Sequence, residues 1–227
     1  MSKVRLQVFI LVDTSGSMAG EPAEALLKGL HRMQALMRQS EAIRQGVDIC
    51  VIGFSSEAKI LVPLSSIDSA DFPLELDSAG STAMAEAIYL MLGLLRTSRI
   101  SGGPLLLPPL VLLITDGVPT DDFDYALVRM KESMWSARVA WALPGADENL
   151  LGQFIGGDES VTNIVTSVSR GSSAHVDAFC VLVKSFLSDD DTNGDEAAGP
   201  SGVRPILPRT GEAGLWGAGE SKTGWIL

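Results

Sequence analysis

Apolar runs of strand length, rich in β-branched residues, recur along the chain. They occupy residues 4–12, 47–54, 110–115, 139–143 and 163–168. Uninterrupted apolar runs are typical of strands that are buried on both faces, and 110–115 is the most apolar of them. A shorter run at 59–62 lies close enough to 47–54 to form a hairpin with it, which predicts an antiparallel edge strand.

Between these runs, apolar residues recur every three or four positions, which places them on one face of a helix. The four series are Leu26, Leu30, Met33 and Met37; Ile88, Met91, Leu92 and Leu95; Phe123, Leu127, Met130 and Met134; and Val176, Phe179, Val183 and Phe186. Pro22 suits the first turn of the first helix, and Gly80-Ser81-Thr82 opens the second. Strands therefore alternate with helices.

This alternation predicts an α/β fold with a doubly wound, mostly parallel six-stranded sheet, helices on both faces and one antiparallel edge strand. The expected strand order is 3-2-1-4-5-6, which places the first and fourth strands side by side where the winding reverses. The apolar pattern ends after Leu187. We therefore expect one domain over residues 1–187 and a flexible tail over 188–227, acidic at first and then rich in Gly and Pro.

Candidate chemistry lies where the predicted strands end. Asp13, Ser15 and Ser17 follow the first strand, Asp116 follows the fourth, and Thr82 lies in the loop that leads into a helix. In the predicted strand order these three segments converge on the crevice where open α/β sheets bind ligands. Asp, Ser and Thr are also ordinary turn and cap residues. It is the combination of three segments, each at the required end of its element, that favours a binding site.

These side chains offer two carboxylates and three hydroxyls, and no thiol or imidazole. Such a hard oxygen shell predicts one magnesium or manganese ion, with water completing an octahedron. Alternate residues of the Asp13–Ser17 loop point the same way, which explains the Asp-x-Ser-x-Ser spacing, and Gly16 is expected to permit the tight turn.

The same residues resemble a known site. Asp13–Ser17, Thr82 and Asp116 match the metal-ion-dependent adhesion site of the von Willebrand factor A (VWA) domain family, and the resemblance spans about residues 4–187. The sequence has Ser81 where the family usually has a second glycine before the threonine. The resemblance implies the same doubly wound fold and a domain that binds other proteins through the metal.

The resemblance also implies a role for each residue. Ser15, Ser17 and Thr82 would ligate the ion directly, and Asp13 and Asp116 would act through water. A carboxylate of the protein partner would complete the shell.

Residues 18–22 and 115–121 look more narrowly like the bacterial tellurium-resistance branch, the TerY-like proteins. That branch implies a stress-response assembly with a kinase and a protein phosphatase.

Charge and composition argue against several other classes of function. The chain of 227 residues has a formal net charge of −11, which argues against binding nucleic acid or anionic lipid. No apolar stretch is long enough for a signal peptide or a membrane span, so the expected location is cytoplasmic. The two cysteines, Cys50 and Cys180, are expected to be buried thiols.

The main alternative is a magnesium-dependent phosphohydrolase that uses Asp13. Haloacid-dehalogenase-type phosphatases need an acid two residues later, where this chain has Ser15. No glycine-rich nucleotide loop ending in Lys-Ser or Lys-Thr occurs, so a nucleotide switch is not expected. A third alternative is an adaptor that has lost its metal, although all five ligands are present. We therefore expect that the protein is not an enzyme.

Two further expectations concern residues outside the set of five candidate ligands. Asp121 and Asp122 are expected to stabilise the N-terminus of the helix that follows them, through the helix dipole. Trp135 and Trp141 are expected in the core.

Overall fold

In the computed structural model, which describes residues 4–100, 105–156, 162–167 and 173–187, six strands form one sheet in the order β3-β2-β1-β4-β5-β6. The strands are β1 (Leu6–Asp13), β2 (Val47–Phe54), β3 (Ala58–Ser66), β4 (Leu110–Thr115), β5 (Ala137–Ala142) and β6 (Thr162–Ser167). β3 runs antiparallel to β2, and the other neighbouring pairs are parallel. The predicted strand order and antiparallel edge are confirmed.

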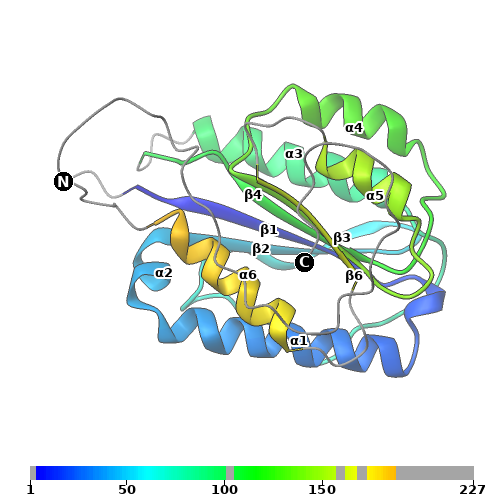
Figure 1. Cartoon of the computed structure of the whole chain (residues 1–227), viewed down its shortest axis with the longest axis horizontal. Helices are drawn as coiled ribbons and strands as arrows, with labels where there is room; N and C mark the ends of the chain where they lie inside the picture. Colours follow the sequence, from blue (N-terminus) through cyan, green and yellow to red (C-terminus); the bar gives the residue numbers. More distant parts are fainter. Residues whose placement is uncertain (1–3, 101–104, 157–161, 168–172, 188–227) are drawn as a thin grey trace, which may run out of the picture.

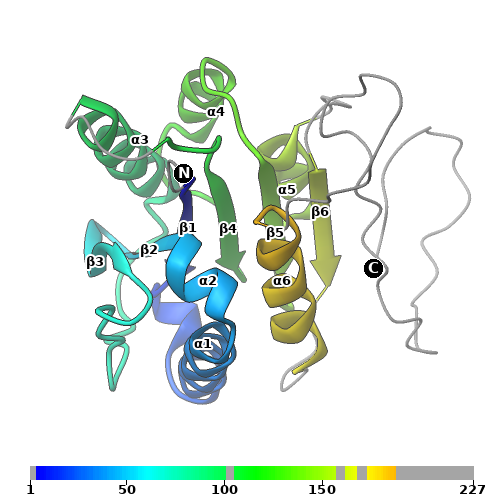
Figure 2. The same ribbon diagram turned by 90° about the vertical axis from the view of Figure 1, so that its left-hand side faces the viewer.

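Helices cover both faces of the sheet, as Figures 1 and 2 show. One face carries α1 (Glu21–Gln39), α2 (Glu41–Gly46) and α6 (Ala174–Ser185). The other face carries α3 (Met84–Ile100), α4 (Phe123–Lys131) and α5 (Glu148–Ile155). The sheet is therefore the middle of three layers.

The apolar run of β1 is explained by burial on both faces. Val8 and Ile10 pack on the side of α1 and α6, whereas Phe9 and Leu11 pack on the side of α3 and α4. All eight residues of the strand are buried. Full burial of each such side chain stabilises the fold by about 1.5–3 kcal/mol, so a polar residue here would be costly.

Several elements differ from the prediction. The short helices α2 and α5 were not expected, and β3 is longer than 59–62. α5 begins at an Asp147 cap whose carboxylate accepts from two backbone N–H groups, those of Asn149 and Leu150. α4 ends at Lys131, so Met134 lies outside it and is 75% exposed. The chain has to turn after Met130 in order to enter β5, which overrides the helical spacing.

The expected burial is confirmed for Trp135, Trp141 and Cys50, whereas Cys180 is only partly buried. No helix among the described residues is long and apolar enough to cross a membrane. The predicted tail, 188–227, lies outside the described residues.

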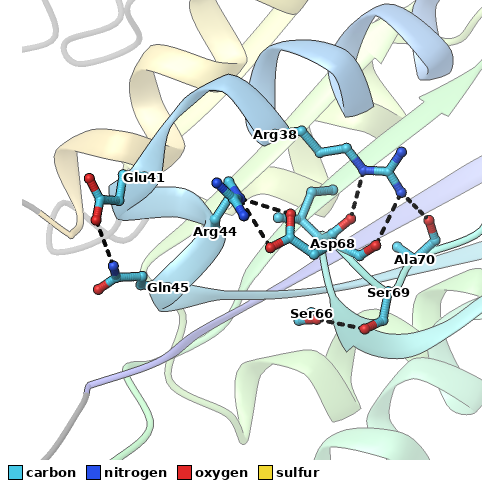
Figure 3. Close-up of polar contacts among 9 residues, drawn as sticks. Arg38, Glu41, Arg44, Gln45, Ser66, Asp68, Ser69 and Ala70 are labelled. Atoms are coloured by element: carbon cyan, nitrogen blue, oxygen red, sulfur yellow. Dashed lines mark hydrogen bonds and ion pairs between the residues drawn. The ribbon is translucent and has the colours of Figure 1, made fainter.

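The segment between β3 and α3 has little regular structure and is held against the C-terminal half of α1 (Figure 3). The guanidinium of Arg38 donates to the carbonyl oxygens of Ile67 and Ala70, at 3.1 and 2.8 Å. Arg44 of α2 forms an ion pair with Asp68 at 2.9 Å. The start of the segment is thereby fixed on the helical layer.

The same segment is held further along the chain. Gln34 donates to the Ala70 carbonyl at 2.9 Å, and the imidazole Nε2 of His31 lies 2.9 Å from the Pro73 carbonyl oxygen. Together with Arg38, these residues form a stripe along α1. Their spacing of three and four residues places them on one side of the helix.

Candidate metal centre

The site is built on the carboxyl ends of β1 and β4. These strands are direct parallel neighbours, with Val12 paired to Ile114. Asp13 closes β1 and Asp116 follows β4 directly, so the topology brings the two acidic positions to the same edge of the sheet. This confirms the predicted meeting point.

After Asp13 the chain turns sharply away from the sheet. The Thr14 N–H donates to the Phe54 carbonyl at 2.8 Å, and a 3-10 turn, η1 (Gly16–Met18), follows. The positive φ angles among the described glycines fall at other positions, so the turn does not depend on a left-handed conformation at Gly16.

Three of the predicted residues form a continuous chain of oxygen atoms. Ser15 Oγ lies 3.0 Å from Ser17 Oγ, and Ser17 Oγ donates to Asp116 Oδ1 at 2.8 Å. Ser15 is buried, Asp116 is half-buried and Ser17 is exposed. The row is therefore buried at Ser15 and open to solvent at its middle member, Ser17.

The Asp13 carboxylate lies beneath this row and is fully buried. Its Oδ1 accepts from the Ser15 N–H at 2.8 Å, and its Oδ2 accepts from the Thr115 hydroxyl. Burial raises the pKa of Asp13 above its ordinary value of 3.8, and the nearby charge of Asp116 adds to this, although the hydrogen bonds from Thr115 and Ser15 oppose it. Ionised Asp13 therefore sits in an environment that a nearby cation would stabilise.

Thr82 reaches the same place from the opposite side. A Cβ added to Gly117 would lie 3.3 Å from Thr82 Oγ1 and 3.5 Å from Asp13 Oδ2, so both oxygens border one glycine. The Thr82 backbone is held on both sides, because its N–H donates to Thr120 Oγ1 at 3.2 Å and its carbonyl accepts from the Thr120 N–H at 2.9 Å. The structure thus brings all five predicted residues together.

The loop after β1 and the segment before α3 are also joined through their backbones. The Gly16 N–H donates to the Gly80 carbonyl at 3.0 Å. Gly80 has a φ of +86°, and an added Cβ would lie 2.3 Å from Ser56 Oγ. A side chain at this position would break the contact that holds Thr82 beside the loop.

The spacing of the oxygens fits the predicted ion. In an octahedral site with metal–oxygen distances of about 2.0–2.1 Å, neighbouring ligand oxygens lie about 2.9 Å apart. The Ser15–Ser17 and Ser17–Asp116 oxygen distances are 3.0 and 2.8 Å. The Ser15–Ser17 separation therefore matches one edge of such an octahedron, and the Ser17–Asp116 separation is that of an ordinary hydrogen bond.

Sequence reasoning missed Thr115, which fixes Asp13, and Thr120, which fixes Thr82. Thr115 looks like an ordinary β-branched strand residue, and its role depends on a tertiary contact. Sequence reasoning also missed a contact of Asp121, whose carboxylate accepts from two backbone N–H groups at the start of α3, at 3.0 Å each. Asp122 does cap α4, accepting from the Tyr125 N–H at 3.2 Å.

Comparison with known proteins agrees with this fold. Residues 7–179 match the family model of the von Willebrand factor type A domain. A UPF0353 protein from Mycolicibacterium paratuberculosis (strain ATCC BAA-968 / K-10) is 26% identical over 197 residues, which cover 80% of this chain and 59% of that protein. The chain thus spans less than two thirds of that relative.

Solved structures share the fold at low identity. A von Willebrand factor type A protein from Catenulispora acidiphila has a TM-score of 0.55 at 14% identity, covering 81% of this chain and 42% of that one. The pilus adhesin SpaC from Lactobacillus rhamnosus GG has a TM-score of 0.59 at 16% identity, covering 81% and 30%.

Proposed function

The chain belongs to the von Willebrand factor type A family, and on that basis we propose that it is a metal-dependent protein-binding domain. It would hold one Mg²⁺ or Mn²⁺ ion and use it to bind a carboxylate of a protein partner. The observation that carries the proposal is the convergence of oxygens from three segments: Ser15 and Ser17 lie 3.0 Å apart, exposed Ser17 donates to Asp116, and Thr82 and Asp13 border the same glycine.

When bound, the ion would supply two positive charges that attract a partner carboxylate. Ser15, Ser17 and Thr82 are proposed as direct ligands, with Asp13 and Asp116 acting through water. Asp13 would keep its orientation because both of its oxygens already accept hydrogen bonds from the chain. Ser17 is exposed, so the site would be open to solvent on the side where a partner would approach.

We propose binding rather than hydrolysis. A nucleophilic Asp13 would need an oxygen free to attack a substrate, but its carboxylate is buried and engaged on both oxygens. Ser15 occupies the position of the acid that a phosphohydrolase would require. A phosphatase activity that disappears in Asp13→Asn protein would overturn this part of the proposal.

The partner is proposed to belong to a bacterial tellurium- or stress-resistance assembly that includes a kinase and a protein phosphatase. Support comes from the resemblance of residues 18–22 and 115–121 to the TerY-like branch. Purified kinase and phosphatase provide direct binding probes.

Two measurements test the function. Manganese titration followed by electron paramagnetic resonance should give one bound ion per chain, and weaker binding in Ser17→Ala and Asp116→Ala. Partner binding should be strong in Mg²⁺ and lost in EDTA and in Thr82→Ala, with circular dichroism confirming that each protein is folded. Full-strength partner binding in EDTA by folded protein would mean that the partner uses another surface.

A further inference from the structure

A cavity of about 440 Å³ opens beside the candidate metal centre. Its walls come from α1, from the carboxyl ends of β4 and β5, and from the start of α6, and α1 and α6 lie side by side on this face (Figures 1 and 2). Ser17 and Asp116 belong to its lining as well as to the row of oxygens. The cavity and the metal centre are therefore continuous.

The interior of the cavity is mainly apolar. The apolar lining includes Met18, Pro22, Leu26, Ile114, Trp141 and Leu143. Trp141 is held in place by edge contacts with His175 and Phe179, at ring-centroid distances of 6.3 and 5.9 Å. A fixed aromatic ring flanked by aliphatic side chains favours a large apolar group.

Charge is distributed unevenly along this cavity. At its far end, Arg32 is paired with Asp177 at 2.9 Å and Lys28 lies 3.9 Å from Glu24, so the two basic groups are balanced. The end near the metal centre carries the carboxylate of Asp116. A carboxylate of a ligand would therefore be attracted only to the end of the cavity where the metal ion would sit. An uncharged group of the ligand suits the rest of the cavity.

We infer that the cavity binds a large apolar side chain, Leu or Phe, which lies one or two residues from the partner carboxylate. The inference rests on the proposed function, because the carboxylate is taken to bind at the metal centre. It adds a specificity rule: the partner segment would combine an acidic residue with an adjacent apolar one. Burial of such a side chain is worth at least about tenfold in affinity.

Four fluorescently labelled, capped hexapeptides test the rule. Their central residue is Asp or Asn, and it is flanked on both sides either by Leu and Phe or by Gly. Fluorescence anisotropy with the full chain in Mg²⁺ should rank the Asp peptide with apolar flanks at least tenfold tighter than the Asp peptide with glycine flanks. Binding of the Asp peptides should be lost in EDTA, and the Asn peptides should not bind.

A matched pair of variants locates the effect. Ala25 lines the cavity, whereas Ala35 is exposed on the same helix and does not line it. Ala25→Phe should remove the tenfold preference and leave binding of Mn²⁺ and of the glycine-flanked Asp peptide unchanged. Ala35→Phe should change none of these.

The possible failures are distinct. Mg²⁺-dependent binding of both Asp peptides with equal affinity would overturn the inference and leave the proposed function standing. Equal binding of the Asp and Asn peptides, or equal binding in Mg²⁺ and in EDTA, would overturn the proposed function and the inference with it. If the tenfold preference arose only in a chain ended after Leu187, the occupant would be this chain's own C-terminal segment, and the inference would be wrong.

Discussion

At the scale of single residues, the Asp13 carboxylate is stabilised by hydrogen bonds rather than by a cation. Within the described residues it forms no ion pair, and Asp116 adds a like charge nearby. Hydrogen bonds from Thr115 and Ser15 offset part of the cost of burying the charge. Neutralising Asp13 should therefore affect the metal-free and metal-bound proteins in opposite ways.

We expect Asp13→Asn to be at least as stable as the wild type in EDTA and to gain no stability from Mg²⁺. The wild type should gain about 1.4 kcal/mol at tenfold excess over Kd, or about 3–6 °C in Tm for a domain of this size. Thermal unfolding in EDTA and in Mg²⁺ measures both effects. Asp124→Asn, an exposed change on α4, should behave as the wild type does.

The same residue predicts a pH dependence in EDTA. The folded pKa of Asp13 lies above the unfolded value of 3.8, so the folded state holds this proton more tightly. The resulting stabilisation is complete below the unfolded pKa and is lost as pH rises through the folded pKa. Denaturant unfolding between pH 4 and 8 should show the wild type losing stability relative to Asp13→Asn as pH rises. A constant difference between the two would contradict the raised pKa.

At the scale of elements, α1 positions the segment that carries Thr82. Arg38 donates to three carbonyl oxygens at the start of this segment, those of Ile67, Asp68 and Ala70 (Figure 3). Arg44 instead forms an ion pair with Asp68 in which both side chains are about half exposed. Both arginines therefore hold the same turn, but only Arg38 satisfies backbone carbonyls. Exposed ion pairs contribute little to stability, whereas unsatisfied carbonyls are costly.

Arg38→Ala should therefore lower the free energy of unfolding by about 1–2 kcal/mol and increase hydrogen exchange in residues 67–83. It should also weaken Mn²⁺ binding, since Thr82 would be held less firmly. Arg44→Ala is the matched control and should have a smaller effect on all three. Equal effects of the two variants would show that the carbonyl contacts do not position the segment.

The elements differ in how well the sequence predicts them. The strands 47–54 and 110–115 were predicted to the residue, because burial on both faces leaves runs that are almost wholly apolar, with Asp48 as the charged exception. The short helices α2 and α5 carry too few turns for a periodic pattern. Met134 fits the helical spacing of α4, but the chain turns before it.

The residues of the candidate site also differ in how well the sequence predicts them. The five candidate ligands were predictable because each follows a strand or precedes a helix, and the strand order brings the segments after β1 and β4 together. Thr82 is added to them by backbone contacts with Gly16 and Thr120. Thr115, Thr120 and Asp121 act through contacts between segments far apart in sequence. Their residue types are common in strands, turns and caps, so no local pattern distinguishes them.

At the scale of the whole molecule, the described domain closes with residues that still belong to its core. Phe186 and Leu187 pack against the cluster beneath α1 and α6. A Cβ added to Gly46 would lie 2.8 Å from Leu187 Cδ2, so this side chain fits closely against the end of α2. Residues 188–227, in contrast, lack any apolar periodicity. Phe186 and Leu187 therefore belong to the domain, and its end at residue 187 is a prediction from the sequence.

Two truncations test this boundary. Ending the chain after Leu187 should leave Tm within about 2 °C of the full chain, because the removed residues offer no periodic apolar face to the core. Ending it after Ser185 removes Phe186 and Leu187 as well and should cost at least about 2 kcal/mol, since two apolar side chains leave the core. Thermal unfolding of the three chains side by side separates the outcomes. A fall of several degrees on ending at Leu187 would show that residues within 188–227 dock on the domain, with Trp216 and Trp225 as the first side chains to substitute.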